Sequence, residues 1–292
     1  MTKAKKAVKP AKKKTTKKVV VKKTAKKPVK VIKKTVAKKA TAKKAKKITS
    51  RVEVKVKKTK KSQGIELQDL LEAGCHFGHS QTKTHPRIKD YLYTTRDGVA
   101  IFDLVKTKEC LDRAQEFVTK LVSAKKKIVF VGAKRQAREV VKKAATDAEM
   151  PYVINRWLGG TITNWEEIKK NSVDKLNRLK KEWDEGKYQK RPKKEQSLIR
   201  HEIARLERIA GGLAKLDVLF DAIFVVDIKA EETAVKEARA KGMPVIAVVD
   251  SNCDPTLVDY PIPANDDAVK SIQLLVNAIA QTAKKASKSE QK

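Results

Sequence analysis

Short apolar runs alternate with amphipathic stretches over much of this chain. KIVFV (residues 127–131), DAIFVVD (221–227) and MPVIAVVD (243–250) are almost wholly apolar, which is typical of strands buried on both faces of a parallel sheet. PYVIN (151–155) and YPI (260–262) add two shorter candidates. Helical patterns follow at residues 231–242 and 266–283. The alternation predicts an α/β domain in which four or five parallel strands form a doubly wound sheet with helices on both faces.

Residues 155–216 interrupt that alternation. Apolar positions recur at helical spacings, then a polar break covers residues 184–192, and heptad-like spacing follows. We predict an inserted antiparallel coiled-coil helical hairpin, about 30 Å long. Its two helices should meet along a seam, with the hairpin outside the sheet's own core. The seam residues are predicted to be Leu176, Leu179 and Trp183 on the first helix and Ile203, Leu206 and Leu213 on the second. Trp165 and Trp183 are interpreted as seam residues rather than base-stacking platforms.

The segment before the sheet predicts a smaller set of elements. IELQDLLEAG (residues 65–74) has the pattern of a short amphipathic helix that stops at a glycine. YLY and VAIF flank the turn sequence TTRDG and predict two short strands. Residues 104–124 carry apolar side chains at helical intervals.

Charge divides the chain into two parts. The 292 residues have a formal net charge of +35. Residues 1–61 hold 28 Lys or Arg and one acid, whereas residues 62–292 hold 41 basic and 33 acidic residues. The first part has too few apolar side chains to form a core, so we predict a disordered Lys-rich tail that binds phosphates without reading sequence. We assign the α/β domain to residues 62–284, with the hairpin at about 161–216, and a flexible carboxyl terminus to 285–292.

Composition also narrows the setting. Three widely spaced cysteines imply no disulfide framework, and no apolar run has the length of a signal peptide core or a membrane span. We therefore expect a cytoplasmic protein without a membrane partner. Neither GxGxxG nor GxxxxGK[ST] follows a strand, and no catalytic constellation is recognisable, so no small-molecule substrate or enzymatic activity is expected.

Six motifs stand in an order that resembles one known family. They are HFGH (76–79), FVGAKRQA (130–137), NRWLGGTITNW (155–165), DAIFVVD (221–227), GMPVIAVVDSNCDP (242–255) and IPANDDAVKSI (262–272). Together they resemble the bacterial small-subunit ribosomal protein S2 family over about residues 67–283. The resemblance implies a flavodoxin-like domain with a protruding coiled-coil hairpin and no catalysis. It further implies a place on the small ribosomal subunit in contact with rRNA and neighbouring ribosomal proteins.

Basic side chains outside the tail are candidates for that contact. The predicted RNA-binding residues are Lys83, Arg87, Arg96, Lys134, Arg135, Arg156, Lys190 and Arg191. Simple solvent exposure is the alternative for Lys134 and Arg135. At the level of function, the alternative is a nucleoid-associated polyanion binder that acts through the basic tail.

A cluster of soft and imidazole ligands suggests a metal. Cys75, His76, His79 and His85 are closely spaced, and His79 with Asp250 or Asp266 could hold zinc or magnesium and pin the loop after the first helix. The alternative, which the lack of a second ligand pair favours, is that the histidines are hydrogen-bonded structural residues and Asp266 caps a helix.

Overall fold

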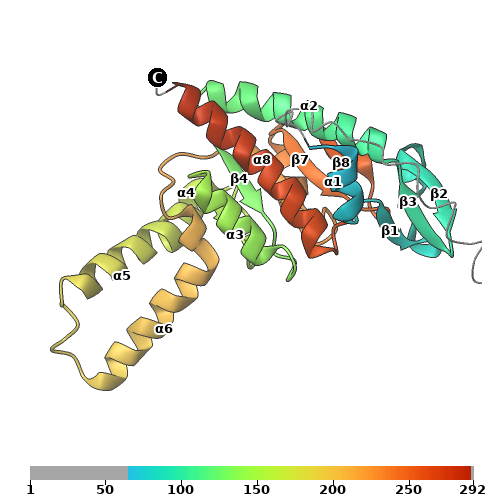
Figure 1. Ribbon diagram of the computed structural model, residues 1–292. Helices are drawn as coiled ribbons and strands as arrows, with labels where there is room; N and C mark the ends of the chain where they lie inside the picture. Colours follow the sequence, from blue (N-terminus) through green and yellow to red (C-terminus); the bar gives the residue numbers. More distant parts are fainter. Residues whose placement is uncertain (1–64, 291–292) are drawn as a thin grey trace, which may run out of the picture. The chain divides into compact units, whose positions relative to one another are not determined.

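The structure is a computed structural model that describes residues 65–290 (Figure 1). The basic tail predicted for residues 1–61 lies outside these residues. None of the described helices is long and apolar enough to cross a membrane.

Five parallel strands form the main sheet. They are β4 (Ile128–Val131), β5 (Tyr152–Val153), β6 (Ala222–Val226), β7 (Val245–Val249) and β8 (Tyr260–Pro263), in the spatial order β5-β4-β6-β7-β8. This is the 2-1-3-4-5 order of flavodoxin-like sheets. The predicted α/β class with a doubly wound parallel sheet is confirmed.

Helices cover both faces of this sheet, and the strand sequences explain why. In β6, Phe224 points into a core shared with α2 (Leu104–Ser123), α3 (Arg138–Asp147) and α8 (Val269–Glu290), whereas Ile223 and Val225 point to the opposite face with α7 (Glu232–Ala240). All five side chains of β6 are buried. Because successive side chains alternate between the faces, an uninterrupted apolar run is what two buried faces require. Helix α8 continues to Glu290, through residues predicted to form a flexible terminus.

A second, antiparallel sheet lies beside α1 (Leu67–Glu72) and α2. Its order is β1-β3-β2, from β1 (Phe77–Ser80), β2 (Leu92–Arg96) and β3 (Val99–Phe102). Two of these strands were predicted, but β1 was missed because FGHS is short and partly polar. Asp97 and Gly98 both have positive φ, at 51° and 76°, as a two-residue type I′ turn between β2 and β3 requires.

Between β5 and β6 the chain forms the helices α4 (Trp165–Ile168), α5 (Lys175–Asp184) and α6 (Lys193–Ala210). A π-helical segment, η3 (Lys169–Asp174), joins α4 to α5, and a 3₁₀ turn, η4 (Gly211–Leu213), follows α6. We call residues 165–213 the α4–α6 segment. Figure 1 shows α5 and α6 extending away from the main sheet.

The base of the α4–α6 segment belongs to the core of the sheet. Trp165, Val173, Ala210 and Leu213 are buried in the same cluster as the side chains of β4, β6 and β7. The prediction that the whole hairpin lies outside the sheet's core is therefore wrong for its base. The sequence misled because helical spacing says which face is apolar, but not what that face packs against.

Candidate functional site

A group of charged side chains lies at the carboxyl edge of the main sheet, between β4 and β6. This is the switch point of the sheet, where the direction of the strand order reverses. Lys134 Nζ, after β4, lies 2.5 Å from Asp266 Oδ1, 2.7 Å from Asp267 Oδ1 and 3.4 Å from Asp227 Oδ2. Ligands of flavodoxin-like sheets bind at this point of the fold. Here side chains of the protein occupy it, and their ion pairs link three loops.

Burial changes the protonation of this group. Desolvation, together with the charges of Asp227 and Asp250, raises the pKa of Asp266 to about 7, against the opposing effect of Lys134. Burial by itself would lower the pKa of Lys134, but the carboxylates of Asp266 and Asp267 raise it above its ordinary value. Lys134 therefore stays charged and is held by carboxylates, which argues against its predicted role as a phosphate ligand.

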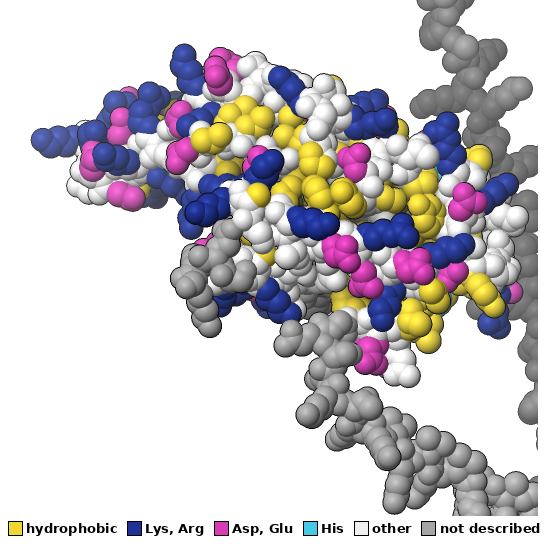
Figure 2. All heavy atoms as spheres, turned by 90° about the horizontal axis from the view of Figure 1, so that it is seen from above, with side chains coloured by type: hydrophobic (Ala, Val, Ile, Leu, Met, Phe, Trp, Pro, Cys, Tyr) yellow, Lys and Arg dark blue, Asp and Glu magenta, His cyan; other side chains and the backbone are white. Residues whose placement is uncertain are grey.

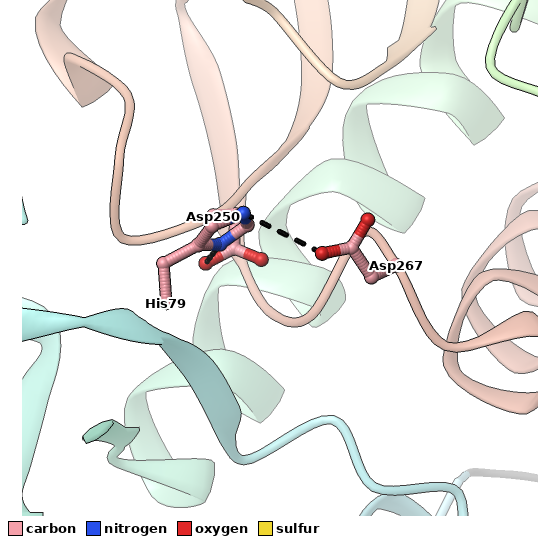
Figure 3. A group of neighbouring side chains, drawn as sticks. All are labelled: His79, Asp250 and Asp267. Carbon is pink, nitrogen blue, oxygen red and sulfur yellow. Dashed lines mark ion pairs between the residues drawn. The ribbon is translucent and has the colours of Figure 1, made fainter. Parts of the chain in front are cut away.

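His79 joins the same edge from β1 (Figure 3). Its Nδ1 lies 3.1 Å from Asp250 Oδ1, and its Nε2 lies 3.4 Å from Asp267 Oδ2. One ligand atom from each residue lies within 4.8 Å of the other two, a spacing at which they could hold one metal ion. The structure thus places His79 beside Asp250, as the metal hypothesis requires, but Asp267 takes the third position. Asp266 instead contacts Lys134 and donates its backbone N–H to Asp250 Oδ2 at 3.3 Å.

Gly78 explains how β1 brings His79 so close. A Cβ at this position would lie 2.8 Å from Ser251 Oγ and 3.1 Å from the carbonyl oxygen of Ala100, which no side chain could accommodate without movement. Ser251 Oγ also accepts the backbone N–H of His79 at 2.7 Å. The glycine of HFGH is therefore needed for the close approach of β1 to the loop after β7.

The other members of the Cys/His cluster do not converge on His79. Among the described residues, Cys75 and His76 lie outside the candidate metal group, as does His85, whose Nδ1 accepts the backbone N–H of Arg87 at 3.3 Å. The ring of His76 contacts that of Phe77 at a tilt of 41°, with ring centroids 3.9 Å apart, and burial lowers the pKa of His76. The close spacing of these Cys and His residues in the sequence therefore does not bring them together as ligands of one metal ion.

The motif RWLGGTITNW has a structural explanation that the sequence did not show. On α7, the carboxylate of Glu237 accepts hydrogen bonds from Trp157 Nε1 (3.3 Å), Gly160 N (2.7 Å) and Ile162 N (3.0 Å). Trp157 is buried and contacts Phe220 edge-on. No local signal marks Glu237, because its partners lie 75 to 80 residues earlier in the chain.

The other predicted RNA-binding residues come from three parts of the chain. Lys83, Arg87 and Arg96 belong to the part of the chain that contains the small sheet; Arg135 and Arg156 follow β4 and β5; Lys190 and Arg191 lie between α5 and α6. All seven are exposed. Arg87 is held by Asp254 Oδ2 at 2.7 Å, and Arg191 lies 3.5 Å from Glu195 Oε2.

The loop between α5 and α6 is built around aromatic rings. Tyr188 is buried, and the guanidinium of Arg191 lies 5.2 Å from its ring centroid. Arg200 lies 4.9 Å from the ring of Trp183, which is 6.1 Å from Tyr188. Trp183 thus packs within the loop end of the segment.

Comparison with known proteins identifies the family. The model of the family described as ribosomal protein S2 matches residues 70–286. The chain belongs to the ribosomal protein S2 family. Curated relatives named small ribosomal subunit protein uS2 include those of Chlorobium chlorochromatii (45% identical over 218 residues, 75% of this chain and 86% of the relative) and Cytophaga hutchinsonii (45% over 217 residues, 74% and 85%). That of Synechococcus sp. is 43% identical over 216 residues, 74% of this chain and 86% of the relative.

Proteins of the ribosomal protein S2 family are structural and non-enzymatic, which agrees with the sequence-based expectation for this chain. The matched residues include both sheets and the α4–α6 segment, while residues 1–69 precede the match. The family resemblance expected from the six sequence motifs is confirmed.

Proposed function

We propose that this protein is a structural constituent of the small ribosomal subunit that binds rRNA and neighbouring ribosomal proteins in the cytoplasm. The observation that carries the proposal is the family match over residues 70–286. A nucleoid-associated role is not favoured, because it would depend on the tail alone and would give the domain that matches the family no role. Sedimentation of a cell lysate on a sucrose gradient tests the proposal: the protein should travel with the small subunit. Recovery with DNA in fractions that lack small subunits would instead support the nucleoid role.

Within that function, α5 and α6 are proposed to form a coiled-coil arm that reaches rRNA or a neighbouring protein. Leu176 and Leu206 are buried, and ion pairs connect the helices, between Lys175 and Glu202 at 2.8 Å and between Lys180 and Glu207 at 2.7 Å. The loop and the first turn of α6 present exposed cations beyond these contacts, of which Lys187 lies 3.0 Å from Glu185 Oε2: Lys187, Lys190, Arg191, Lys193 and Lys194. Figure 2 shows Lys and Arg gathered, with some Asp and Glu, at the end of the molecule where α5 and α6 project.

A deletion tests the arm without disturbing the core. Replacing residues 183–200 with a short Gly-Ser linker removes the loop and its cations but keeps Leu176, Leu206 and the buried base. The linker has a short distance to span, because Arg200 lies against the ring of Trp183. The variant should fold and lose small-subunit incorporation. Changing only Lys190 and Arg191 to glutamine should weaken incorporation less. If the deletion variant sediments with the small subunit as well as the intact protein does, the arm is dispensable for docking.

The remaining exposed basic residues, Lys83, Arg87, Arg96, Arg135 and Arg156, are proposed as further rRNA contacts. The chain next to Arg156 is held in place, because Nδ2 of the neighbouring Asn155 donates a hydrogen bond to the carbonyl oxygen of Arg208 at 2.6 Å. Arg156→Gln should weaken rRNA binding uniformly across RNA sequences, as loss of a phosphate contact does. A protection assay on assembled subunits would show which nucleotides respond.

We also propose that His79, Asp250 and Asp267 hold a metal ion that fastens β1 to the loops after β7 and β8. One imidazole and two carboxylates fit zinc better than magnesium, which prefers oxygen ligands alone. Elemental analysis of dialysed protein should give zinc near one equivalent, and His79→Gln should abolish it while His85→Gln retains it. Zinc far below one equivalent in the unsubstituted protein would leave His79 as a structural hydrogen-bonding residue.

A further inference from the structure

The two edges of the main sheet differ in charge. At the carboxyl edge, Lys134 contacts Asp227, Asp266 and Asp267, and Asp250 pairs with His79. At the opposite, amino edge, the connections that lead into the strands carry lysines. Lys126 and Lys127 precede β4, Lys215 precedes β6 and Lys241 precedes β7. We call Lys126, Lys127, Lys215 and Lys241 the amino-edge lysines. A polyanion would be attracted to the amino edge.

Two hollows lie along the amino edge. One, of about 530 Å³, is lined by Lys126 and Lys241 together with Phe117 and Met243. The other, of about 560 Å³, is lined by Lys127 and Lys215 near the base of the α4–α6 segment. Because Lys126 and Lys127 are consecutive, a single turn of chain places one cation over each hollow.

The amino edge also carries acids: Asp221 lines the first hollow and Glu149 the second, but neither forms an ion pair with an amino-edge lysine. Asp221 Oδ2 accepts the backbone N–H of Lys127 at 3.1 Å, and Asp259 Oδ2 accepts that of Val245 at 2.8 Å. All four amino-edge lysines are exposed, and within residues 65–290 none of their side chains forms an ion pair. Their charge is therefore available to a partner.

Two other cations of this edge have an internal explanation. Lys120 and Arg239 lie in the last turns of α2 and α7, where a positive charge complements the helix dipole. Lys241 is the C-cap residue of α7, whereas Lys126, Lys127 and Lys215 lie beyond the helix ends. The lysines of the connections are therefore the cations that indicate a partner.

Aromatic rings make the partner more specific. Phe117, which lines the first hollow, stacks on Tyr260 with ring centroids 4.3 Å apart and planes 20° apart. Tyr260 also lines an adjoining hollow of about 340 Å³ with Arg239. Phosphate-binding cations beside flat aromatic side chains suit a nucleic-acid strand, whose bases can stack, better than an acidic peptide.

We propose that the amino edge of the main sheet is an rRNA-binding surface, in which the amino-edge lysines contact phosphates of a single RNA segment. This inference rests on the proposed ribosomal function and adds to it a surface that includes none of the eight basic residues predicted from the sequence. The bound RNA would run from Lys215, near the base of the α4–α6 segment, past Lys126 and Lys127 to Lys241.

The test compares two variants of the full chain with equal charge. The first changes the amino-edge lysines to glutamine: Lys126→Gln, Lys127→Gln, Lys215→Gln and Lys241→Gln. The matched control changes four exposed lysines of α3 and α8: Lys142→Gln, Lys143→Gln, Lys270→Gln and Lys284→Gln. Affinity for small-subunit rRNA is measured as a function of salt. The amino-edge variant should lower the slope of log affinity against log salt by about 2.8 to 3.6, at about 0.7 to 0.9 for each of four phosphate contacts. The control should keep the slope of the unsubstituted protein.

The outcomes separate this proposal from the function it rests on. Equal slopes for the two variants overturn the amino-edge surface, provided that the unsubstituted protein still sediments with the small subunit. Failure of the unsubstituted protein to sediment there overturns the ribosomal function itself. If the amino-edge variant incorporates poorly into subunits but keeps the full salt slope on free rRNA, the surface binds a protein, and the RNA proposal is wrong. Thermal unfolding of both variants shows that each is folded.

Discussion

At the residue scale, Glu237 shows how one carboxylate fixes a long loop. It accepts three hydrogen bonds from residues 157–162, two of them from backbone N–H groups. A charged acceptor satisfies such donors more strongly than a neutral one. The loop in turn places Trp157 and Ile162 in the core below α7.

Removing this carboxylate should destabilise the protein. We expect Glu237→Ala to lower the free energy of unfolding by about 3 kcal/mol, because three part-buried donors lose their acceptor. Glu232→Ala, on the exposed side of the same helix where Glu232 pairs with Lys236, should change it by less than about 0.5 kcal/mol. Urea unfolding of both variants measures the difference. Equal losses would show that the loop does not depend on Glu237.

Glu231 predicts a pH dependence. This buried side chain accepts the backbone N–H of Ala133 at 2.8 Å, and desolvation raises its pKa to about 7. Since the unfolded chain ionises Glu231 near pH 4.5 and the folded chain only near pH 7, Glu231 makes the protein less stable as pH rises through this window. Glu231→Gln keeps an acceptor oxygen without a charge. The variant should gain stability relative to the unsubstituted protein between pH 4.5 and 7, by up to about 3 kcal/mol.

Unfolding measured in urea at several pH values checks that expectation. Because Glu232 is exposed on the surface of α7, Glu232→Gln serves as the control and should show no such trend. A constant difference between Glu231→Gln and the unsubstituted protein across the window would contradict the raised pKa of Glu231.

Residue roles at the candidate site were only partly predictable. Lys134, Asp227 and Asp250 each follow an apolar run, and this position is enough to place them at one edge, because the carboxyl ends of parallel strands share an edge. The sequence did not predict which carboxylate faces His79, because Asp266 and Asp267 are neighbours and only the path of the loop decides between them. Glu237 was missed because its role depends on a contact far away in sequence.

At the scale of elements, apolar patterns predicted the strands well and the helical insertion less well. Short, uninterrupted apolar runs such as IVFV and VIAVV have few alternatives to a buried strand. The first predicted helix of the hairpin, in contrast, contains a π-helical segment at Lys169–Asp174, which shifts the apolar face between Trp165 and Leu176. Leu213 was predicted to extend the seam, but it lies in the turn after α6 and packs into the sheet's core.

The predicted seam has a direct test at Leu206. Only 3% of this side chain is exposed, so Leu206→Asp would bury a charge without a partner. We expect a loss of about 3 kcal/mol in the stability of the α4–α6 segment. Leu198→Asp is the matched control, because Leu198 on the same helix is 61% exposed and should tolerate the change.

Hydrogen exchange resolves where the loss from Leu206→Asp occurs. Amides of α5 and α6 should exchange faster in this variant, while those of β6 and β7 keep their protection. Uniformly faster exchange through the sheet would mean that α5 and α6 do not unfold as a separate unit.

At the scale of the whole molecule, most of the positive charge lies outside the described residues. Residues 1–61 carry +27 of the formal net charge of +35. We predict that this tail raises RNA affinity without sequence preference. Replacing it with a Gly-Ser segment of equal length should lower the slope of log affinity against log salt by about 0.7 to 0.9 for each phosphate that the tail neutralises.

The same measurement on duplex DNA serves as the comparison for the tail. A loss of similar size on both nucleic acids fits contacts to phosphates alone. An unchanged slope on rRNA after replacement of the tail would show that residues 1–61 do not touch the RNA.

The contact between Glu237 and Ile162 also bears on the order in which the protein can fold as it is made. The two residues are separated by 75 positions, so the loop after β5 leaves the ribosome long before its acceptor exists. At about 5 to 20 residues per second, the delay is about 4 to 15 s. During that interval the donors of Gly160 and Ile162 have only water as a partner, and the aromatic side chains of the loop lack the strand β7 against which their core forms. A nascent chain that ends before residue 237 should therefore expose this loop to proteases, and extension by a few tens of residues, enough to clear the exit tunnel, should close it.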